Sequence, residues 1–121
     1  MANKIISTHF SDRELDCNCG CGKTVDPELL TRLEALRRML GKPLIVTSGA
    51  RCATHNRKVG GKPASWHLKG LAVDISCNDS KLRCEIIQMA ALLGFKGIGI
   101  AKTFIHLDLR PADQGRCWLY N

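Results

Sequence analysis

The stretch that decides the fold is SWHLKGLAVD at residues 65–74, which has a counterpart downstream in FIHLDL at residues 104–109. Apolar and polar residues alternate in the second half of the first stretch and throughout the second one. Successive side chains of a strand point to opposite faces, so Asp74 leaves the apolar face of its strand. By the same rule His106 and Asp108 share the polar face of theirs. The alternation predicts two strands that each bury one face and present polar groups on the other.

A third strand is predicted at residues 97–101, where the sequence begins GIGI. Gly97 and Gly99 fall on the same face of this strand and carry no side chain. Glycine in a strand interior is typical of places where another backbone or a ligand approaches closely. We therefore expect the missing bulk to leave room for a metal ion and a substrate.

Two helices are predicted from their capping residues and apolar spacing. The first spans residues 27–40, with Asp26 as N-cap, Pro27 at the first helical position and Gly41 after the last. The second spans residues 81–93, capped by Ser80 and ended by Gly94. Their buried stripes are expected to be Leu29, Leu33, Leu36 and Leu40 in the first, and Leu82, Ile86, Met89 and Leu93 in the second.

These elements predict an α+β fold in which helices pack on an antiparallel sheet. The four expected strands lie near residues 44–47, 71–76, 97–101 and 104–109. The chain has 121 residues, of which 45% are hydrophobic, and this suffices for one modest core. We expect a single domain over residues 1–121, and a monomer.

His67, Asp74 and His106 are the candidate metal ligands. Two imidazole nitrogens, one carboxylate oxygen and an open fourth position make up the ligand set of a hydrolytic zinc site. A histidine or aspartate in a strand is more often structural. The assignment of these three residues as metal ligands therefore depends on their occurring together and with their flanking motif.

That motif resembles the zinc D-Ala-D-Ala carboxypeptidase family, also known as the LAS metallopeptidases of the hedgehog/DD-peptidase fold. The likeness extends over nearly the whole chain. Its residues here are Ser65, His67, Gly70, Ala72, Asp74 and His106, together with TSGAR at 47–51 and shorter matches at 9–11, 26–29 and 60–61. The resemblance implies the same fold and cleavage of peptidoglycan stem peptides, as a D,D-carboxypeptidase or as an endopeptidase of stem peptides or cross-links. Small members of this family include phage endolysins.

Residue by residue, the resemblance makes His67, Asp74 and His106 the ligands of one catalytic Zn²⁺. Arg51 resembles the substrate-binding arginine of the family, and a guanidinium can bind a carboxylate through two hydrogen bonds. Ser65 is expected to add a hydrogen bond to the same substrate group.

The general base is harder to assign. Many family members have an acidic residue three positions before the last histidine, where this chain has Thr103. Asp108 is the expected substitute, because it shares a strand face with His106 and carboxylates serve as general bases. The alternative is that Asp108 holds a histidine ligand in the correct tautomer.

Cysteine is abundant, with seven in the chain, and Cys17, Cys19 and Cys21 form the run CNCGCG. This Cys-x-Cys spacing differs from the Cys-x-x-Cys of most structural zinc sites. We expect reduced thiols in a tight glycine-rich loop, as in most cytoplasmic chains, and leave open whether the three bind metal.

The formal net charge of +7 favours polyanionic partners. Only six aromatic residues of the Phe, Tyr and Trp types are available to interleave with the basic ones, so we expect anionic cell-wall polymer and no nucleic acid as the partner. No apolar run is long enough for membrane insertion, and no signal-peptide stretch follows residues 1–4. We expect synthesis in the host cytoplasm and action on the wall after release.

Three functions therefore follow as hypotheses. The first is a bacteriolytic zinc metallopeptidase that degrades the cell wall, such as a phage endolysin. The second is a non-catalytic zinc-binding module of the same fold that binds cell-wall peptides, and Thr103 keeps it open. The third, a phage structural or nucleic-acid-binding protein, depends only on charge and size. Zinc content separates the third from the others, and hydrolysis separates the first from the second.

Overall fold

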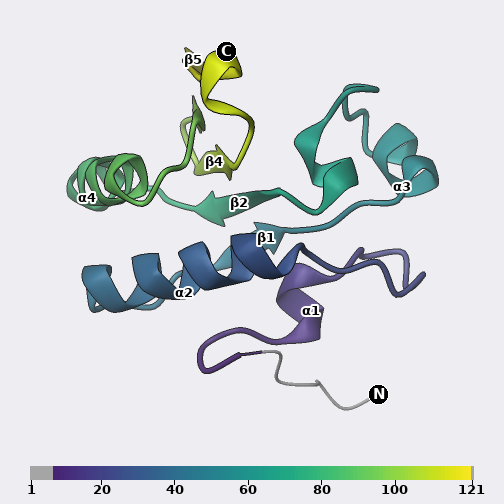
Figure 1. The fold of residues 1–121 in the computed structure, drawn as a ribbon, viewed down its shortest axis with the longest axis horizontal. Coiled ribbons are helices and arrows are strands. Elements are labelled where there is room, and N and C mark those ends of the chain that lie inside the picture. The colour runs from purple at the N-terminus through teal and green to yellow at the C-terminus, as the bar shows by residue number, and fades with distance from the viewer. Residues whose placement is uncertain (1–6, 121) are drawn as a thin grey trace.

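The computed structural model describes residues 7–120, in which one five-stranded sheet is flanked by helices (Figure 1). The N-terminal residues 1–4, used above to judge export, lie outside this range. The strands follow the order β1-β2-β4-β3-β5 across the sheet. Their bounds are β1 Val46–Ser48, β2 Ala72–Ser76, β3 Gly97–Ile100, β4 Phe104–Asp108 and β5 Arg116–Leu119.

The sheet is antiparallel from β1 to β3, as predicted, but β5 joins it parallel to β3. Strand β5 was not predicted from the sequence. Its residues are exposed except for the half-buried Trp118, so it has no alternating apolar face that could have indicated a strand. The strand forms because its backbone pairs with the edge of β3.

Helix α2 has the predicted limits, whereas α4 begins and ends slightly earlier than predicted. The helices are α1 Asp12–Leu15, α2 Pro27–Leu40, α3 Ala53–Lys58 and α4 Ser80–Leu92, and the 3₁₀ helices are η1 Trp66–Lys69 and η2 Ala112–Gln114. Asp26 caps α2 by accepting from the Glu28 amide, and Gly41 ends it with φ of 70°. The prediction that Ser80 caps α4 is wrong, because Asp79 does so by accepting from the Leu82 amide.

The core lies on one face of the sheet, against α2 and α4 (Figure 1). All four leucines of the predicted α2 stripe are buried. Of the predicted α4 stripe only Ile86 is fully buried, while the other three residues are partly buried against the core.

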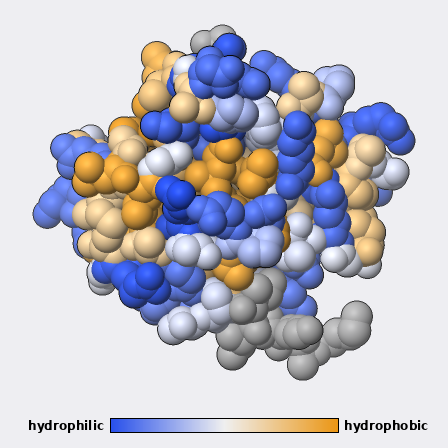
Figure 2. All heavy atoms as spheres, viewed as in Figure 1, coloured by the Kyte–Doolittle hydropathy of each residue, from blue (hydrophilic) through white to orange (hydrophobic). Residues whose placement is uncertain are grey.

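On the face seen in Figure 2, apolar residues reach the surface between hydrophilic ones that dominate its rim. No helix within residues 7–120 is long and apolar enough to cross a membrane.

The opposite face of the sheet carries the polar residues that the alternation predicts. Asp74 pairs across the strands with His106, and Gly99 pairs with His106 from the other side. Gly97 pairs with Asp108 in the same way. Directly opposed residues of neighbouring strands point to the same face. The register therefore places the candidate metal ligands of β2 and β4 side by side and away from the core.

Glu34 joins the segment before α1 to α2. This buried carboxylate accepts hydrogen bonds from the Ser7 hydroxyl at 2.6 Å and from the His9 amide at 2.7 Å, and it pairs with His9 Nδ1 at 2.6 Å. Burial raises the pKa of Glu34, but the bonds from Ser7 and His9 outweigh burial and hold the pKa below its usual value. The carboxylate form therefore stabilises the folded chain.

We expect Glu34→Gln to lower the free energy of unfolding at neutral pH by about 1–3 kcal/mol, because it removes a buried, charged hydrogen-bond acceptor. Since the folded-state pKa is lowered, the stabilisation is present above the unfolded pKa of about 4.3 and is lost as the pH falls through the lower folded value. Urea denaturation from pH 3 to 7 should thus show a flatter fall in the free energy of unfolding towards acid pH for the variant than for wild type. The exposed Glu28→Gln is the control, and parallel pH curves for Glu34→Gln and wild type would contradict the prediction.

Candidate metal centre

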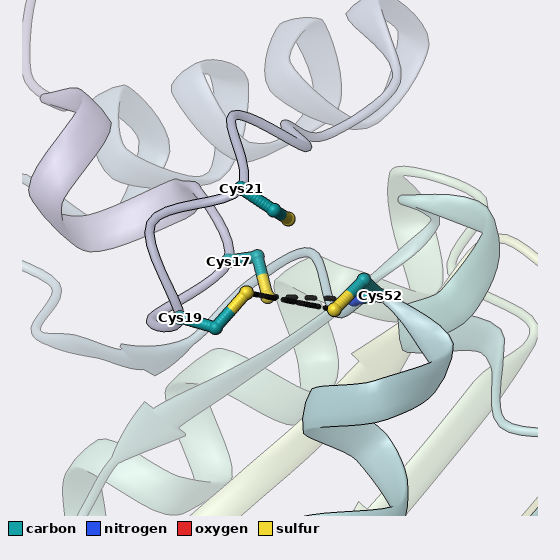
Figure 3. A group of neighbouring side chains, drawn as sticks. All are labelled: Cys17, Cys19, Cys21 and Cys52. Carbon is teal, nitrogen blue, oxygen red and sulfur yellow. Dashed lines mark hydrogen bonds between the residues drawn. The ribbon is translucent and has the colours of Figure 1, made fainter.

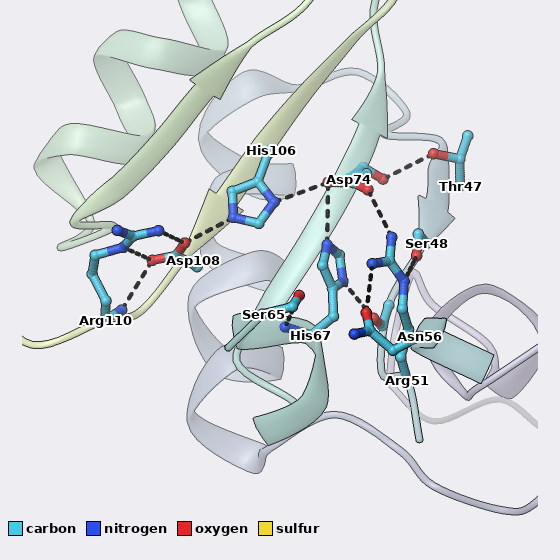
Figure 4. A network of polar contacts seen from close by, with 11 residues as sticks. Thr47, Ser48, Arg51, Asn56, Ser65, His67, Asp74, His106, Asp108 and Arg110 are labelled. Atoms are coloured by element: carbon cyan, nitrogen blue, oxygen red, sulfur yellow. Dashed lines mark hydrogen bonds and ion pairs between the residues drawn. The ribbon is translucent and has the colours of Figure 1, made fainter. Parts of the chain in front are cut away.

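Three side chains from separate elements bring their donor atoms to one point (Figure 4). His67 comes from η1, Asp74 from β2 and His106 from β4. Asp74 Oδ1 lies 3.4 Å from His67 Nε2 and 3.1 Å from His106 Nδ1. One donor atom of each residue lies within 4.8 Å of the others. The three ligands expected from the sequence are thus brought together.

The second nitrogen of each imidazole is already engaged. His67 Nδ1 donates to the Gly49 carbonyl at 2.7 Å, and His106 Nε2 donates to Asp108 Oδ2 at 2.8 Å. Metal-binding histidines almost always donate their remaining N–H to such an oxygen, which sets the tautomer and the ring orientation. The lone pairs of His67 Nε2 and His106 Nδ1 are thereby directed at the point shared with Asp74.

Burial and charge at this point favour a cation. His67 and His106 are buried, and the Asp74 side chain is 14% exposed. Burial raises the pKa of Asp74, yet hydrogen bonds from His106 and His67 hold it well below its usual value. Burial lowers the pKa of His106, but its bonds to Asp108 and Asp74 raise it above its usual value. Two imidazole nitrogens with one carboxylate oxygen fit Zn²⁺.

Local sequence explains how His67 reaches this point from outside the sheet. The Ser65 hydroxyl accepts from the His67 amide at 3.2 Å and caps η1. Gly70 ends η1 with φ of 70°, a left-handed conformation that favours glycine. A Cβ there would lie 3.0 Å from the Asp26 amide nitrogen, so the chain passes close to the segment that leads into α2 before it enters β2. Ser65 thus positions His67, and a hydroxyl that accepts one hydrogen bond can also donate its own proton.

Asp108 lies on the far side of His106 from the other donors. It is fully buried, and Arg110 donates to both of its oxygens at 2.8 and 2.7 Å. Burial raises its pKa, but the bonds from Arg110 and His106 hold it well below its usual value. This geometry disfavours the expected general-base role, because a base must reach the substrate and accept a proton near neutral pH. The partner Arg110 was missed, although an arginine two residues after Asp108 is a visible signal.

Arg51 lies beside Asp74, on the side away from His106 (Figure 4). Its Nη2 lies 3.5 Å from Asp74 Oδ2, its Nε donates to the Ser48 hydroxyl and its Nη1 to Asn56 Oδ1, both at 3.2 Å. Asn56 is buried and donates in turn to the Lys62 carbonyl. Asn56 was not predicted, because helix α3, whose first turns bring Asn56 back towards Arg51, was not predicted from the sequence. The guanidinium is therefore fixed in direction beside the metal ligands.

The space above the β3 glycines is filled by protein, which corrects the expectation that it holds metal and substrate. A Cβ on Gly97 would overlap the Asp108 carboxylate. A Cβ on Gly99 would lie 2.6 Å from the Trp118 ring and 2.7 Å from the Tyr120 ring. The centroids of the Trp118 and His106 rings are 5.3 Å apart. The absence of side chains at the two glycines therefore makes room for Asp108 and Trp118, which both contact His106.

Thr103 lies exposed in the turn between β3 and β4. Its carbonyl accepts from the Cys77 amide at 2.9 Å. Its hydroxyl cannot take the proton that a carboxylate would accept at this position. Thr103 therefore cannot serve in place of the acidic residue that is expected three positions before the last histidine.

Comparison with known proteins agrees with this geometry. Residues 8–108 match the peptidase M15 family. Over 91 residues, or 72% of this chain, the sequence is 34% identical to the zinc D-Ala-D-Ala carboxypeptidase of Streptomyces albus G. The match covers 35% of that protein, so the chain spans about a third of its relative. The matched range includes His67, Asp74 and His106, and the chain belongs to the peptidase M15 family.

Proposed function

We propose that the protein is a zinc-dependent peptidase that acts on peptidoglycan stem peptides, with His67, Asp74 and His106 as the zinc ligands. The observation that carries the proposal is that each of the two histidine rings has an oxygen partner on one nitrogen and Asp74 beside the other. One nitrogen donates to a fixed oxygen, and the other faces Asp74. Membership of the peptidase M15 family and the name of the Streptomyces relative support the same reaction class.

A zinc ion held there would polarise a scissile carbonyl and activate water for attack at neutral pH. The residues of the chain orient the partners of that reaction. Gly49 and Asp108 hold the two imidazoles, and Arg51 presents a guanidinium next to the Asp74 carboxylate. We assign Asp108 a positioning role through His106, in place of the general-base role.

Arg51 is proposed to bind a carboxylate of the stem peptide, either the terminal D-Ala carboxylate or an internal one. Ser48 and Asn56 each accept one of its N–H groups, which fixes the plane of the guanidinium. Its Nη2 faces Asp74 at a distance of 3.5 Å, too long for a strong bond. A substrate carboxylate can therefore be bound there without displacing the groups that orient the arginine. Ser65 is proposed to donate its hydroxyl proton to the same substrate group.

We expect Arg51→Ala to raise KM for a D-Ala-D-Ala peptide by about tenfold or more, because a charged hydrogen bond to substrate is lost. Zinc content should stay as in wild type, since Arg51 supplies no ligand. Steady-state kinetics and metal analysis measure the two effects. Arg57→Ala on α3 removes the same charge from an exposed site and should change neither. Unchanged constants for Arg51→Ala would rule out the role.

The reaction itself is tested by digesting purified peptidoglycan with the zinc-loaded protein, with and without a chelator. Mass spectrometry of the released fragments identifies the bond. Loss of one terminal alanine indicates a carboxypeptidase, and freed stem peptides or split cross-links indicate an endopeptidase. We further propose a bacteriolytic, endolysin-type role, because the net charge of +7 favours anionic wall polymer. Clearing of suspended cell walls would be the readout of that role.

The second candidate is a non-catalytic module that binds cell-wall peptides through the same centre. Two observations favour this candidate. Thr103 is not acidic, and Asp108 is fully buried, so neither offers the substrate an accessible general base. Chelator-sensitive binding of wall fragments without any released product, from walls of several compositions, would select this candidate.

A further inference from the structure

A second group of possible ligands lies apart from the candidate metal centre and consists only of cysteines (Figure 3). Cys17, Cys19 and Cys21 lie on the loop between α1 and α2, and Cys52 is the N-cap of α3. Their four sulfur atoms all lie within 4.8 Å of one another. Cys52 is far from the other three in sequence, so only the fold completes the set.

The distances between sulfurs fit a shared metal ion and do not fit disulfides. Cys17 Sγ lies 3.4 Å from Cys19 Sγ and 3.9 Å from Cys52 Sγ, and Cys19 Sγ lies 3.5 Å from Cys52 Sγ. A disulfide bond is about 2.05 Å long. Four sulfurs arranged as a tetrahedron at about 2.3 Å from a zinc ion are about 3.8 Å apart. The observed separations lie close to that value.

The backbone explains how Cys-x-Cys-x-Cys can supply three ligands. The Cys17 amide donates to the Lys23 carbonyl at 2.8 Å and closes the loop. Gly20 and Gly22 have φ of 82° and 90°, which residues with a side chain rarely adopt. Gly20 separates Cys19 from Cys21, and Gly22 follows Cys21, so the chain turns after each of these two cysteines. In an extended chain the three sulfurs would point to one side but would lie about 7 Å apart from one to the next, and the loop brings them together at one gap.

Peptide N–H groups point at two of the sulfurs. The Cys52 amide donates to Cys17 Sγ and the His55 amide donates to Cys52 Sγ, both at 3.4 Å. Such donors favour the thiolate, and the thiolate is the form that binds metal. The expectation of reduced thiols is compatible with this arrangement.

We propose that Cys17, Cys19, Cys21 and Cys52 bind a second zinc ion, distinct from the one assigned to the metal centre. Four sulfur ligands make a closed tetrahedral shell with no position for water or substrate, so this ion is structural. The sequence left metal binding by the first three cysteines open and gave no reason to connect them to Cys52.

This site would hold the segment that supports the metal centre. Arg51 immediately precedes Cys52, and its amide donates to the His67 carbonyl at 3.0 Å. The Ala50 amide donates to the Leu15 carbonyl at 2.8 Å, next to the cysteine loop. The Gly49 carbonyl accepts from His67 Nδ1. A zinc ion bound by the four cysteines therefore ties the N-terminal loop to residues 49–52, which orient both Arg51 and His67.

The first test uses the wild-type protein, purified with a reductant. We expect two zinc ions per chain by elemental mass spectrometry. X-ray absorption at the zinc edge should show sulfur neighbours at about 2.3 Å alongside nitrogen and oxygen neighbours. Cobalt-loaded protein should show a sulfur-to-cobalt charge-transfer band. One zinc per chain with only nitrogen and oxygen neighbours would overturn the proposal, as would tightly bound iron in place of the second zinc.

Variants locate the second ion. We expect Cys19→Ser and Cys21→Ser each to lower the zinc content by one ion and to weaken the cobalt-thiolate band. Cys84→Ser and Cys117→Ser change exposed cysteines outside the cluster and should keep both ions. Full zinc content in both cluster variants would overturn the proposal. The outcome is independent of peptidase activity, because His67→Ala should lose the other ion and keep the cobalt-thiolate band whether or not the wild type cleaves peptides.

Discussion

Replacing His67 or His106 with alanine is expected to abolish peptide hydrolysis, with a fall in kcat/KM of at least about a thousandfold, or about 4 kcal/mol. Each change removes one of three proposed zinc ligands and leaves Asp74 with a single imidazole partner. Two remaining ligands cannot hold zinc at a site that needs three protein donors and an open position. We therefore expect zinc at this centre to be lost together with activity.

Zinc content and turnover of the same preparations test this expectation. The far-ultraviolet circular dichroism spectrum shows whether the fold is retained. His55→Ala provides the matched control, because His55 lies on α3 and is not among the residues that could hold a metal ion at the centre. The control should keep wild-type zinc content and activity. A His67 or His106 variant that retains full zinc and full turnover would exclude the assigned ligand.

Asp108→Asn is expected to give the second largest effect, a loss of about 10–100-fold in zinc affinity or activity. The substituted amide would offer His106 Nε2 a weaker, neutral acceptor and would leave the half-buried Arg110 without its carboxylate partner. Both changes loosen the orientation of the His106 ring. Zinc affinity is measured by competition with a chromogenic chelator, and activity at saturating zinc is measured separately.

The pH dependence distinguishes this positioning role from general-base catalysis. If Asp108 only positions His106, Asp108→Asn weakens zinc binding and keeps the shape of the kcat profile. If Asp108 were the base, zinc affinity would stay unchanged and the acid limb of the profile would disappear. Asp113→Asn changes an exposed aspartate of η2 and should resemble wild type in both measurements. Unchanged affinity with a lost acid limb would restore Asp108 to the catalytic step.

The sequence alone predicted the parts of the structure that depend on local patterns. Alternation in residues 71–76 and 104–109 assigned Asp74 and His106 to the polar face, and the register confirms that they are neighbours. Asp26 and Gly41 marked the ends of α2, because capping needs only the residues at a helix terminus. The family was evident from the motif around His67, since its residues lie close together in sequence.

Tertiary structure alone decided those contacts between distant residues that no local pattern indicates. Strand β5 has no apolar alternation and forms only by pairing with β3, and it brings Trp118 against His106. The surrounding fold buries Asp108 between His106 and Arg110, which is the observation behind its proposed positioning role. Cys52 joins the cysteine loop for the same reason. Local periodicity determines which face a side chain occupies, whereas its neighbours, its burial and therefore its charge state are set by packing between elements far apart in sequence.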